Sequence, residues 1–191
     1  MNPFDVAISK FDEYNRVDPN RESMEGEMVA KELVYARRMS ERLQTFEPHA
    51  PEEVRLAARC QHIGRWQIPR TTFPADRKGY LVWRNKLKDH HAAISAKILT
   101  EAGYGQDMID KVRFLLLKKE LHHNKDTQLL EDVVCLVFIE HYLSDFAEKH
   151  DDDKIIDILK KTMKKMTARG ISVATDLRVS SKIKSLLQRS V

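Results

Sequence analysis

The chain of 191 residues is long enough for one domain with a sizeable apolar core. Hydrophobic residues make up 42% of it and charged residues 32%, a balance that excludes a disordered chain, and the net charge is only +4. Six Gly and six Pro are too few for a turn-rich all-β fold, and the two isolated cysteines, Cys60 and Cys135, exclude a disulfide framework and a CxxC zinc finger.

The apolar residues recur mainly at helical spacing, so the sequence predicts an all-α fold. The predicted helices cover 4–15, 27–46, 51–62, 78–102, 106–119, 128–149, 152–166 and 173–189. Gly64 and Gly170 mark expected helix ends, and Pro69 and Pro74 interrupt the irregular stretch 64–76. We expect a single domain over residues 1–191, built as a bundle of about eight helices.

The segment 128–149 is apolar on nearly every side, which is typical of a helix buried at the centre of a bundle. Its β-branched run, 133–139, is also compatible with a strand, but the long helical context favours a helix. The same run is the longest unbroken apolar stretch and is too short to span a bilayer. No signal peptide is evident, so we expect a cytoplasmic protein without a membrane partner.

Four polar residues lie on apolar helix stripes: Glu32, His62, His91 and Glu140. A buried, unpaired carboxylate costs several kcal/mol, so each requires a basic partner, a hydrogen-bond donor or a metal ion. Imidazole and carboxylate ligands together suit Fe or Mn, and less well Zn, so we predict one divalent metal site built from these four residues. The alternative is two buried Glu–His pairs that hold the helices in register.

Residues beside this predicted site leave some roles open. Asp132 and Glu131 lie two turns before Glu140 on the same helix, where they suit a group that orients water better than a ligand of the same ion. If the helix that contains His91 is slightly rotated, the adjacent His90 faces inward instead. In the same way, His141 faces inward instead of Glu140 if its helix is rotated.

Cations and aromatic residues are interleaved from residue 65 to residue 84. Arginine binds phosphate oxygens and aromatic rings stack on bases, so this pattern predicts a phosphate- or nucleotide-binding surface, unless the residues only cap and fill a loop. The predicted substrate-binding residues are Arg65, Trp66, Arg70, Arg77, Arg84 and Lys118, with Trp83 as a second stacking surface.

The C-terminal helices are basic. Residues 154–191 hold ten Lys and Arg against two Asp, a net charge of +8, which leaves −4 on residues 1–153. This charge predicts a contact with RNA or another polyanion. The alternative is a basic helix face that is only exposed to solvent.

Four stretches resemble the metal-binding segments of HD-domain phosphohydrolases: 32–43, VRLAARCQHIGRW at 54–66, 91–120 and CLVFIEHYL at 135–143. In this resemblance Gln61-His62 takes the place of the His-Asp doublet, and His91 matches the leading His of the later helix pair. Glu32 and Glu140 take the places of the first ligand His and the last metal-binding Asp. The resemblance implies an HD-like helical fold and an altered metal site.

A closer resemblance covers most of the chain. The segments QHIGRWQIPR, YLVWRNKL, QLLEDVVCLVFIEHYLSDF and ILKKTMKKMTARG look like a family of unknown function whose members are often labelled glutamyl-tRNA synthetase-like. The residues give that label no support, because an all-α chain lacks the βαβ pattern of a Rossmann catalytic core.

These patterns lead to three hypotheses. The first is an HD-like metal-dependent phosphohydrolase that acts on a nucleotide or related phosphate ester, with Asp132 or Glu131 as the general base. The second is a non-catalytic module of the same fold that binds a nucleotide or RNA. The third is an oxygen-activating enzyme on the same scaffold, since His and carboxylate ligands also serve non-haem iron.

Overall fold

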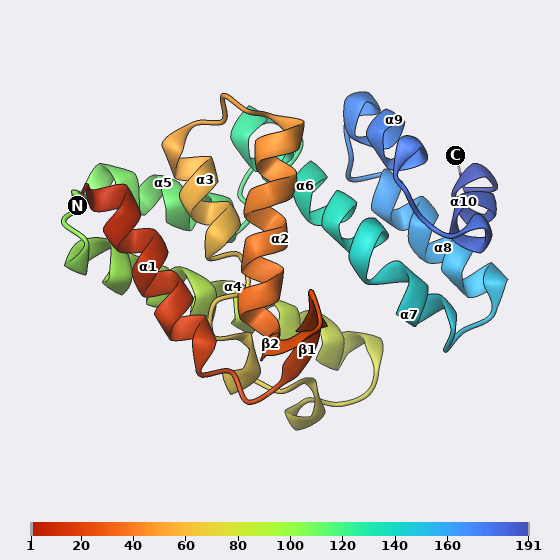
Figure 1. Ribbon diagram of the computed structural model, residues 1–191, viewed down its shortest axis with the longest axis horizontal. Helices are drawn as coiled ribbons and strands as arrows, with labels where there is room; N and C mark the ends of the chain where they lie inside the picture. The colour runs from red at the N-terminus through yellow and green to blue at the C-terminus, as the bar shows by residue number, and fades with distance from the viewer. Residues whose placement is uncertain (1, 191) are drawn as a thin grey trace. The chain divides into compact units, whose positions relative to one another are not determined.

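The computed structural model describes residues 2–190 and confirms the all-α class (Figure 1). Ten α-helices and one two-stranded hairpin are found among these residues. The helices are α1 (Pro3–Arg16), α2 (Lys31–Phe46), α3 (Glu52–Arg59), α4 (Arg77–Glu101), α5 (Gln106–Leu116), α6 (Lys125–His141), α7 (Leu143–Ala147), α8 (Asp152–Met163), α9 (Ala168–Asp176) and α10 (Ser181–Gln188). Two 3₁₀ turns, η1 (Arg65–Gln67) and η2 (Arg70–Thr72), lie in the stretch 64–76, which was predicted to be irregular because of its prolines.

Contacts within the chain divide it into two compact units, one ending at Lys119 and one beginning at Glu120. The first holds α1 to α5 and the hairpin, and the second holds α6 to α10. The single domain predicted over residues 1–191 stays a prediction.

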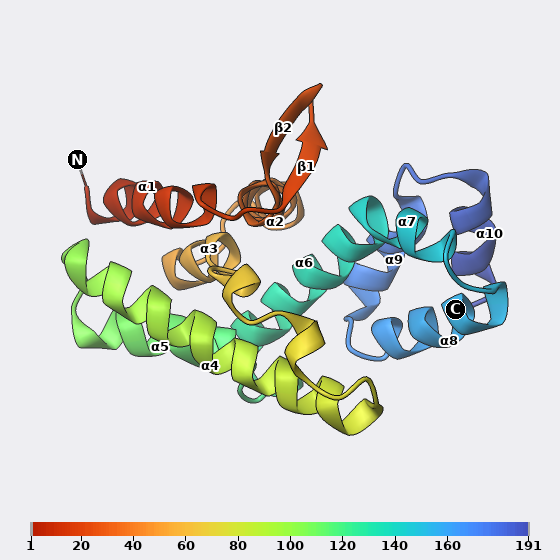
Figure 2. The ribbon, with the colours of Figure 1, turned by 90° about the horizontal axis from the view of Figure 1, so that it is seen from below.

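The first unit is built by pairwise helix packing. Helix α5 packs along α4, α3 packs against α2 and α5, and α1 contacts α2, α3 and α4 (Figure 2). Fully buried apolar side chains from each helix fill the space between them, among them Phe11, Met39, Leu56, Leu99 and Leu116. This packing fixes the start of α2, the end of α3 and the middle of α4 relative to one another, and the candidate site lies on these segments.

A β-hairpin precedes α2, where the sequence predicted helix from residue 27. Strands β1 (Arg21–Met24) and β2 (Glu27–Ala30) pair antiparallel and are joined by Glu25 and Gly26. Both turn residues have positive φ, 53° and 86°, which is the backbone of a two-residue type I′ turn. Met28, expected on the buried stripe, is 66% exposed on β2. The helical prediction failed because short strands next to a helix can continue its apolar spacing.

Two predicted helices in the second unit are divided in the structure. The helix expected at 128–149 is α6 followed by the short α7, and most of α6 is buried. The helix expected at 173–189 is α9 and α10, with the break at 177–180. Gly170, predicted as a helix end, lies inside α9 instead. A Cβ at Gly170 would lie 2.8 Å from the Asp132 carboxylate, so close packing requires glycine here.

None of the helices within residues 2–190 combines the length and apolarity that crossing a bilayer requires.

The close approach of Gly170 to Asp132 predicts that the effect of a substitution at position 170 on stability depends on the residue at position 132. Gly170→Ala is expected to lower the free energy of unfolding by about 1–3 kcal/mol, because the new methyl group displaces a carboxylate that Thr167 holds in place. In an Asp132→Ala background the same change is expected to be neutral or to stabilise by about 0.5–1 kcal/mol, since alanine is the better helix residue. Urea unfolding followed by circular dichroism measures both, and an equal loss in the two backgrounds would contradict the explanation.

Candidate functional site

The candidate site lies in the first unit and consists of Glu32, Tyr35, His62, Arg65 and His91, here called the Glu32–His62 cluster. Glu32 is in the first turn of α2, His62 in the turn after α3, Arg65 at the start of η1 and His91 in the middle of α4. Stretches far apart in the sequence thus supply three of the four residues predicted as metal ligands.

Local structure holds these segments in register. Gly64 has a φ of 68°, which reverses the chain after His62 and permits Arg65 to begin η1. The turn is fastened to α4 because His91 Nδ1–H donates to the Ile63 carbonyl oxygen at 2.6 Å. At the start of α2, the backbone N–H of Glu32 donates to the buried Asp18 carboxylate at 3.1 Å, which fixes where Glu32 enters the unit.

The side chains of the cluster form a closed set of polar contacts. Glu32 Oε2 lies 3.5 Å from His62 Nδ1, and Glu32 Oε1 lies 3.8 Å from Arg65 Nε. Arg65 Nη1 also lies 3.5 Å from His62 Nε2, to which it donates. The Tyr35 ring stacks on His62 with centroids 3.9 Å apart and planes 11° apart. The Arg65 guanidinium therefore stands beside the carboxylate and the imidazole, where it supplies the positive charge that the sequence argument assigned to a metal ion.

Burial controls the protonation of Glu32. The Glu32 side chain is only 8% exposed. Desolvation raises the pKa of Glu32 from 4.5 to about 7, although the positive charge of Arg65 opposes the rise. A carboxyl group with this pKa is partly protonated at neutral pH and exchanges its proton near physiological pH, which is a property of general acids and bases.

Both imidazoles are neutral at physiological pH. Burial lowers the pKa of His91 to about 3 and holds the pKa of His62 well below its usual value of 6.5. The positive charges of Arg65, Lys118 and Arg84 lower the pKa of His62 further. The positive charges of three cations therefore act on one imidazole.

Three of the four predicted ligands belong to the first unit, and the fourth belongs to the second. The rings of His62 and His91 lie 5.8 Å apart between centroids, in the same cluster as Glu32. Glu140 belongs to the second unit, on α6, where it lies 3.4 Å from His141 Nε2. Within residues 2–190, no group of three or more His, Cys, Asp and Glu side chains is placed to hold a metal ion. The four-ligand metal site stays a prediction.

The alternative of two buried Glu–His pairs matches the structure in one case. Glu32 and His62 join α2 to the turn after α3. Glu140 and His141 are sequence neighbours at the end of α6, and the His141 side chain is 31% exposed. The second pair of this hypothesis would join Glu140 to a histidine of the other unit, and it stays a prediction.

The residues predicted as general bases have contacts within the second unit. Asp132 accepts from the Thr167 N–H at 2.8 Å and from the Thr167 hydroxyl at 2.6 Å, and so holds the residue that opens α9. Burial raises the pKa of Asp132. Glu131 is buried, and its Oε1 lies 4.0 Å from Lys165 Nζ. These contacts give Asp132 a structural role, and the catalytic roles of both residues stay predictions.

The predicted substrate-binding residues divide into two groups. Arg70 donates to the carbonyl oxygens of Phe73 and Asp76 at 2.9 and 3.3 Å, so it stabilises its own loop. Trp66 packs near Tyr14, with ring centroids 5.9 Å apart, and Arg77 is exposed at the start of α4.

The second group is directed toward the cluster. Arg65 lies over the Trp83 ring at 4.8 Å, and Trp83 is itself fixed by donating to the Ile68 carbonyl oxygen at 2.8 Å. Arg84 lies 5.7 Å from the Tyr80 ring centroid and, with Lys118, acts electrostatically on His62. Arg65, Arg84 and Lys118 are therefore the predicted cations that the structure associates with the cluster.

Tyr35 of the cluster and Asp18, which supports it, were not predicted from the sequence to take part in the site. The spacing of three residues between Tyr35 and Glu32 is the signal that places both on one helix face. Asp18 is completely buried, and no sequence pattern identified it.

The basic C-terminal helices compensate part of their own charge. Lys182 of α10 and Arg189, which directly follows α10, lie 3.4 and 3.9 Å from the carboxylate of Asp152 at the start of α8. Lys161 pairs with Asp157 one turn earlier on α8. The predicted RNA contact of residues 154–191 stays a prediction.

A family model described as "Domain of unknown function (DUF4202)" matches residues 5–187, which is nearly the whole chain. No curated protein and no solved structure matches it.

The raised pKa of Glu32 predicts a pH-dependent stability. Because the pKa is about 7 in the folded state and 4.5 in the unfolded state, the folded state binds more protons between these values. The free energy of unfolding should therefore fall by about 3 kcal/mol from this group as the pH rises from 4 to 8. Glu32→Gln should remove that fall, as measured by urea unfolding of both proteins across this range.

The matched control is Glu27→Gln, which changes an exposed carboxylate on the hairpin. Its pH profile should run parallel to that of the wild type. A Glu32→Gln profile that also ran parallel would show that Glu32 ionises in the folded protein as it does in the unfolded chain.

Proposed function

The chain belongs to the DUF4202 family of unknown function, and we propose that it binds a nucleotide or a related phosphate ester at the Glu32–His62 cluster. The observation that carries this proposal is the position of the Arg65 guanidinium beside the Glu32 carboxylate and the His62 ring, with the positive charges of Lys118 and Arg84 also acting on His62. Several fixed positive charges beside neutral imidazoles favour an anion with several oxygen acceptors.

The groups of the cluster suit the two halves of such a ligand. Arginine and lysine donate to phosphate oxygens, and Arg65 is held in place by Glu32 and the Trp83 ring, so little ordering is required on binding. A base would stack outside the cluster, on the half-buried Trp66 ring that follows Arg65 in η1 and lies next to Tyr14. Because Glu32 takes up protons near neutral pH, lowering the pH should strengthen the binding of an anion.

Binding of adenosine monophosphate tests the proposal, with adenosine and inorganic phosphate as partial ligands. We expect Arg84→Met and Lys118→Gln each to weaken binding of adenosine monophosphate by about tenfold or more, as for the loss of one charge-assisted hydrogen bond. Isothermal titration calorimetry at low and high salt measures the affinity, which should fall with salt.

Arg113→Met is the matched control, because it removes an exposed cation of α5 that pairs with Asp110 at 3.7 Å. Its affinity should equal that of the wild type. Equal affinities for adenosine and adenosine monophosphate, or no loss in either site variant, would contradict a phosphate-binding role.

A second candidate function is metal-dependent hydrolysis of such an ester, and the orientation of His91 favours it. Its Nδ1–H donates to the Ile63 carbonyl oxygen, which leaves Nε2 unprotonated, as in most metal-binding histidines. The resemblance to HD-domain phosphohydrolases points the same way. A bound Fe or Mn ion supplies a water molecule of lowered pKa. His62 fits less well, because its Nε2 faces Arg65 at 3.5 Å, so ligation through this atom requires Arg65 to move.

Mn(II) binding and turnover separate the two candidates. If the site holds a metal, wild-type protein should bind one Mn(II) by electron paramagnetic resonance titration, and His91→Gln should lose it while retaining its circular dichroism spectrum. The Mn-loaded protein should then hydrolyse at least one member of a panel of nucleotides and phosphodiesters. Absence of both binding and turnover would leave the non-catalytic module as the surviving proposal.

A further inference from the structure

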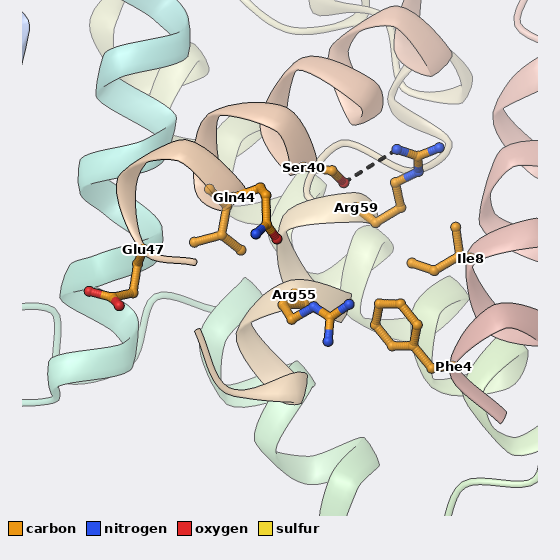
Figure 3. Close-up of a pocket in the computed structure, with 8 residues that line it drawn as sticks. Phe4, Ile8, Ser40, Gln44, Glu47, Arg55 and Arg59 are labelled. Atoms are coloured by element: carbon orange, nitrogen blue, oxygen red, sulfur yellow. Dashed lines mark hydrogen bonds between the residues drawn. The ribbon is translucent and has the colours of Figure 1, made fainter. Parts of the chain in front are cut away.

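We propose that an open pocket lined by residues of α1, of α2 and its C-terminal end, and of α3 binds a small organic carboxylate with an apolar tail. The pocket has a volume of about 190 Å³ and shares no residue with the Glu32–His62 cluster, so this proposal does not rest on the proposed function (Figure 3). Its lining consists of Phe4, Ile8, Ser40, Leu43, Gln44, Glu47, Arg55 and Arg59.

One side of the pocket is apolar. Phe4 and Ile8 come from α1, and Leu43, which is 2% exposed, comes from α2. Transfer of a hydrocarbon group from water to a surface of aliphatic and aromatic side chains is favourable, and a few polar groups then fix its orientation. The ligand should therefore carry an apolar tail of a few carbon atoms.

Arg55 supplies the polar end. Its guanidinium carbon lies 4.3 Å from the centroid of the Phe4 ring, so the group is supported by the ring while its N–H edge stays available to donate. Among residues 2–190, Arg55 has no carboxylate within ion-pair distance. Figure 3 shows the Glu47 carboxylate directed away from Arg55.

Arg59, the second arginine of the pocket, is already satisfied. Its Nε and Nη2 donate to the two oxygens of Asp12 at 2.7 and 2.6 Å, and its Nη1 donates to the Ser40 hydroxyl at 3.3 Å (Figure 3). Arg59 thus forms a rigid, charge-compensated wall. Besides Arg59 and the Glu47 carboxylate, the pocket offers the Arg55 guanidinium and the Gln44 amide, which match a carboxylate better than a doubly charged phosphate.

The experiment uses the full chain with hexanoate as the probe, and measures affinity by ligand-observed nuclear magnetic resonance. Hexylammonium has a similar tail and the opposite charge, and inorganic phosphate has charge without a tail. We expect hexanoate to bind and the two comparison compounds not to bind at the same concentrations. Arg55→Met should weaken hexanoate binding about tenfold or more, and Arg55→Lys should weaken it less, because an ammonium retains the charge without the planar edge.

Two further variants keep the result interpretable. Gln44→Trp places a large ring at the exposed edge of the pocket and should block hexanoate without disturbing the core, whereas Arg113→Met removes a distant cation and should bind hexanoate as the wild type does. The proposal is overturned if the wild type does not bind hexanoate, if Arg55→Met binds it equally well, or if hexylammonium binds as tightly. Each variant's thermal unfolding confirms that it is folded.

Discussion

The carboxylate of Glu32 is buried, and the arrangement around it follows from the cost of that burial. A charged group removed from water must gain a counter-charge or a proton. Glu32 has access to both, because Arg65 lies beside it and its pKa is raised to about 7. The His62 ring, which stacks on Tyr35, lies on another side, with Nδ1 3.5 Å from the Glu32 carboxylate. The site is thus an acid, a base and a cation held within contact distance of one another.

This contact depends on short-range features that lie outside the site. Asp18 accepts the Glu32 N–H and fixes the first turn of α2, and Gly64 permits the reversal that brings Arg65 back toward His62. The hydrogen bond from His91 to Ile63 then fastens that reversal to α4. The two hydrogen bonds contribute about 1 kcal/mol each, but together with the glycine turn they decide which side chains meet.

Sequence periodicity identified much of the fold and part of the site. Glu32, His62 and His91 were found because a polar residue on an apolar stripe requires a partner, and the structure brings these three together. Their partner could not be identified in the same way, because the direction of Arg65 depends on the positive φ of Gly64 and on the Trp83 ring beneath it. Periodicity also missed the hairpin, since β2 continues the apolar spacing of α2.

Arg70 and Asp132 show a second limit of sequence reasoning. Both are chemically suited to the roles predicted for them, yet Arg70 donates to its own loop and Asp132 holds Thr167. Composition identifies which side chains are able to react, whereas competition from nearby backbone groups decides which remain available. For Asp132 the competing group belongs to Thr167, which is close in space but thirty-five positions away in the sequence, so sequence patterns do not reveal it.

The contact between Asp132 and Gly170 has a consequence for how this family diverges. A side chain at position 170 has no room while a carboxylate occupies the space beside it, and a smaller residue at position 132 frees that space. The two positions are therefore not independent under mutation, and relatives that lose the acid are freed to acquire a larger residue in α9. In an alignment of relatives, residues 132 and 170 should therefore tend to be substituted together, because their side chains compete for the same space.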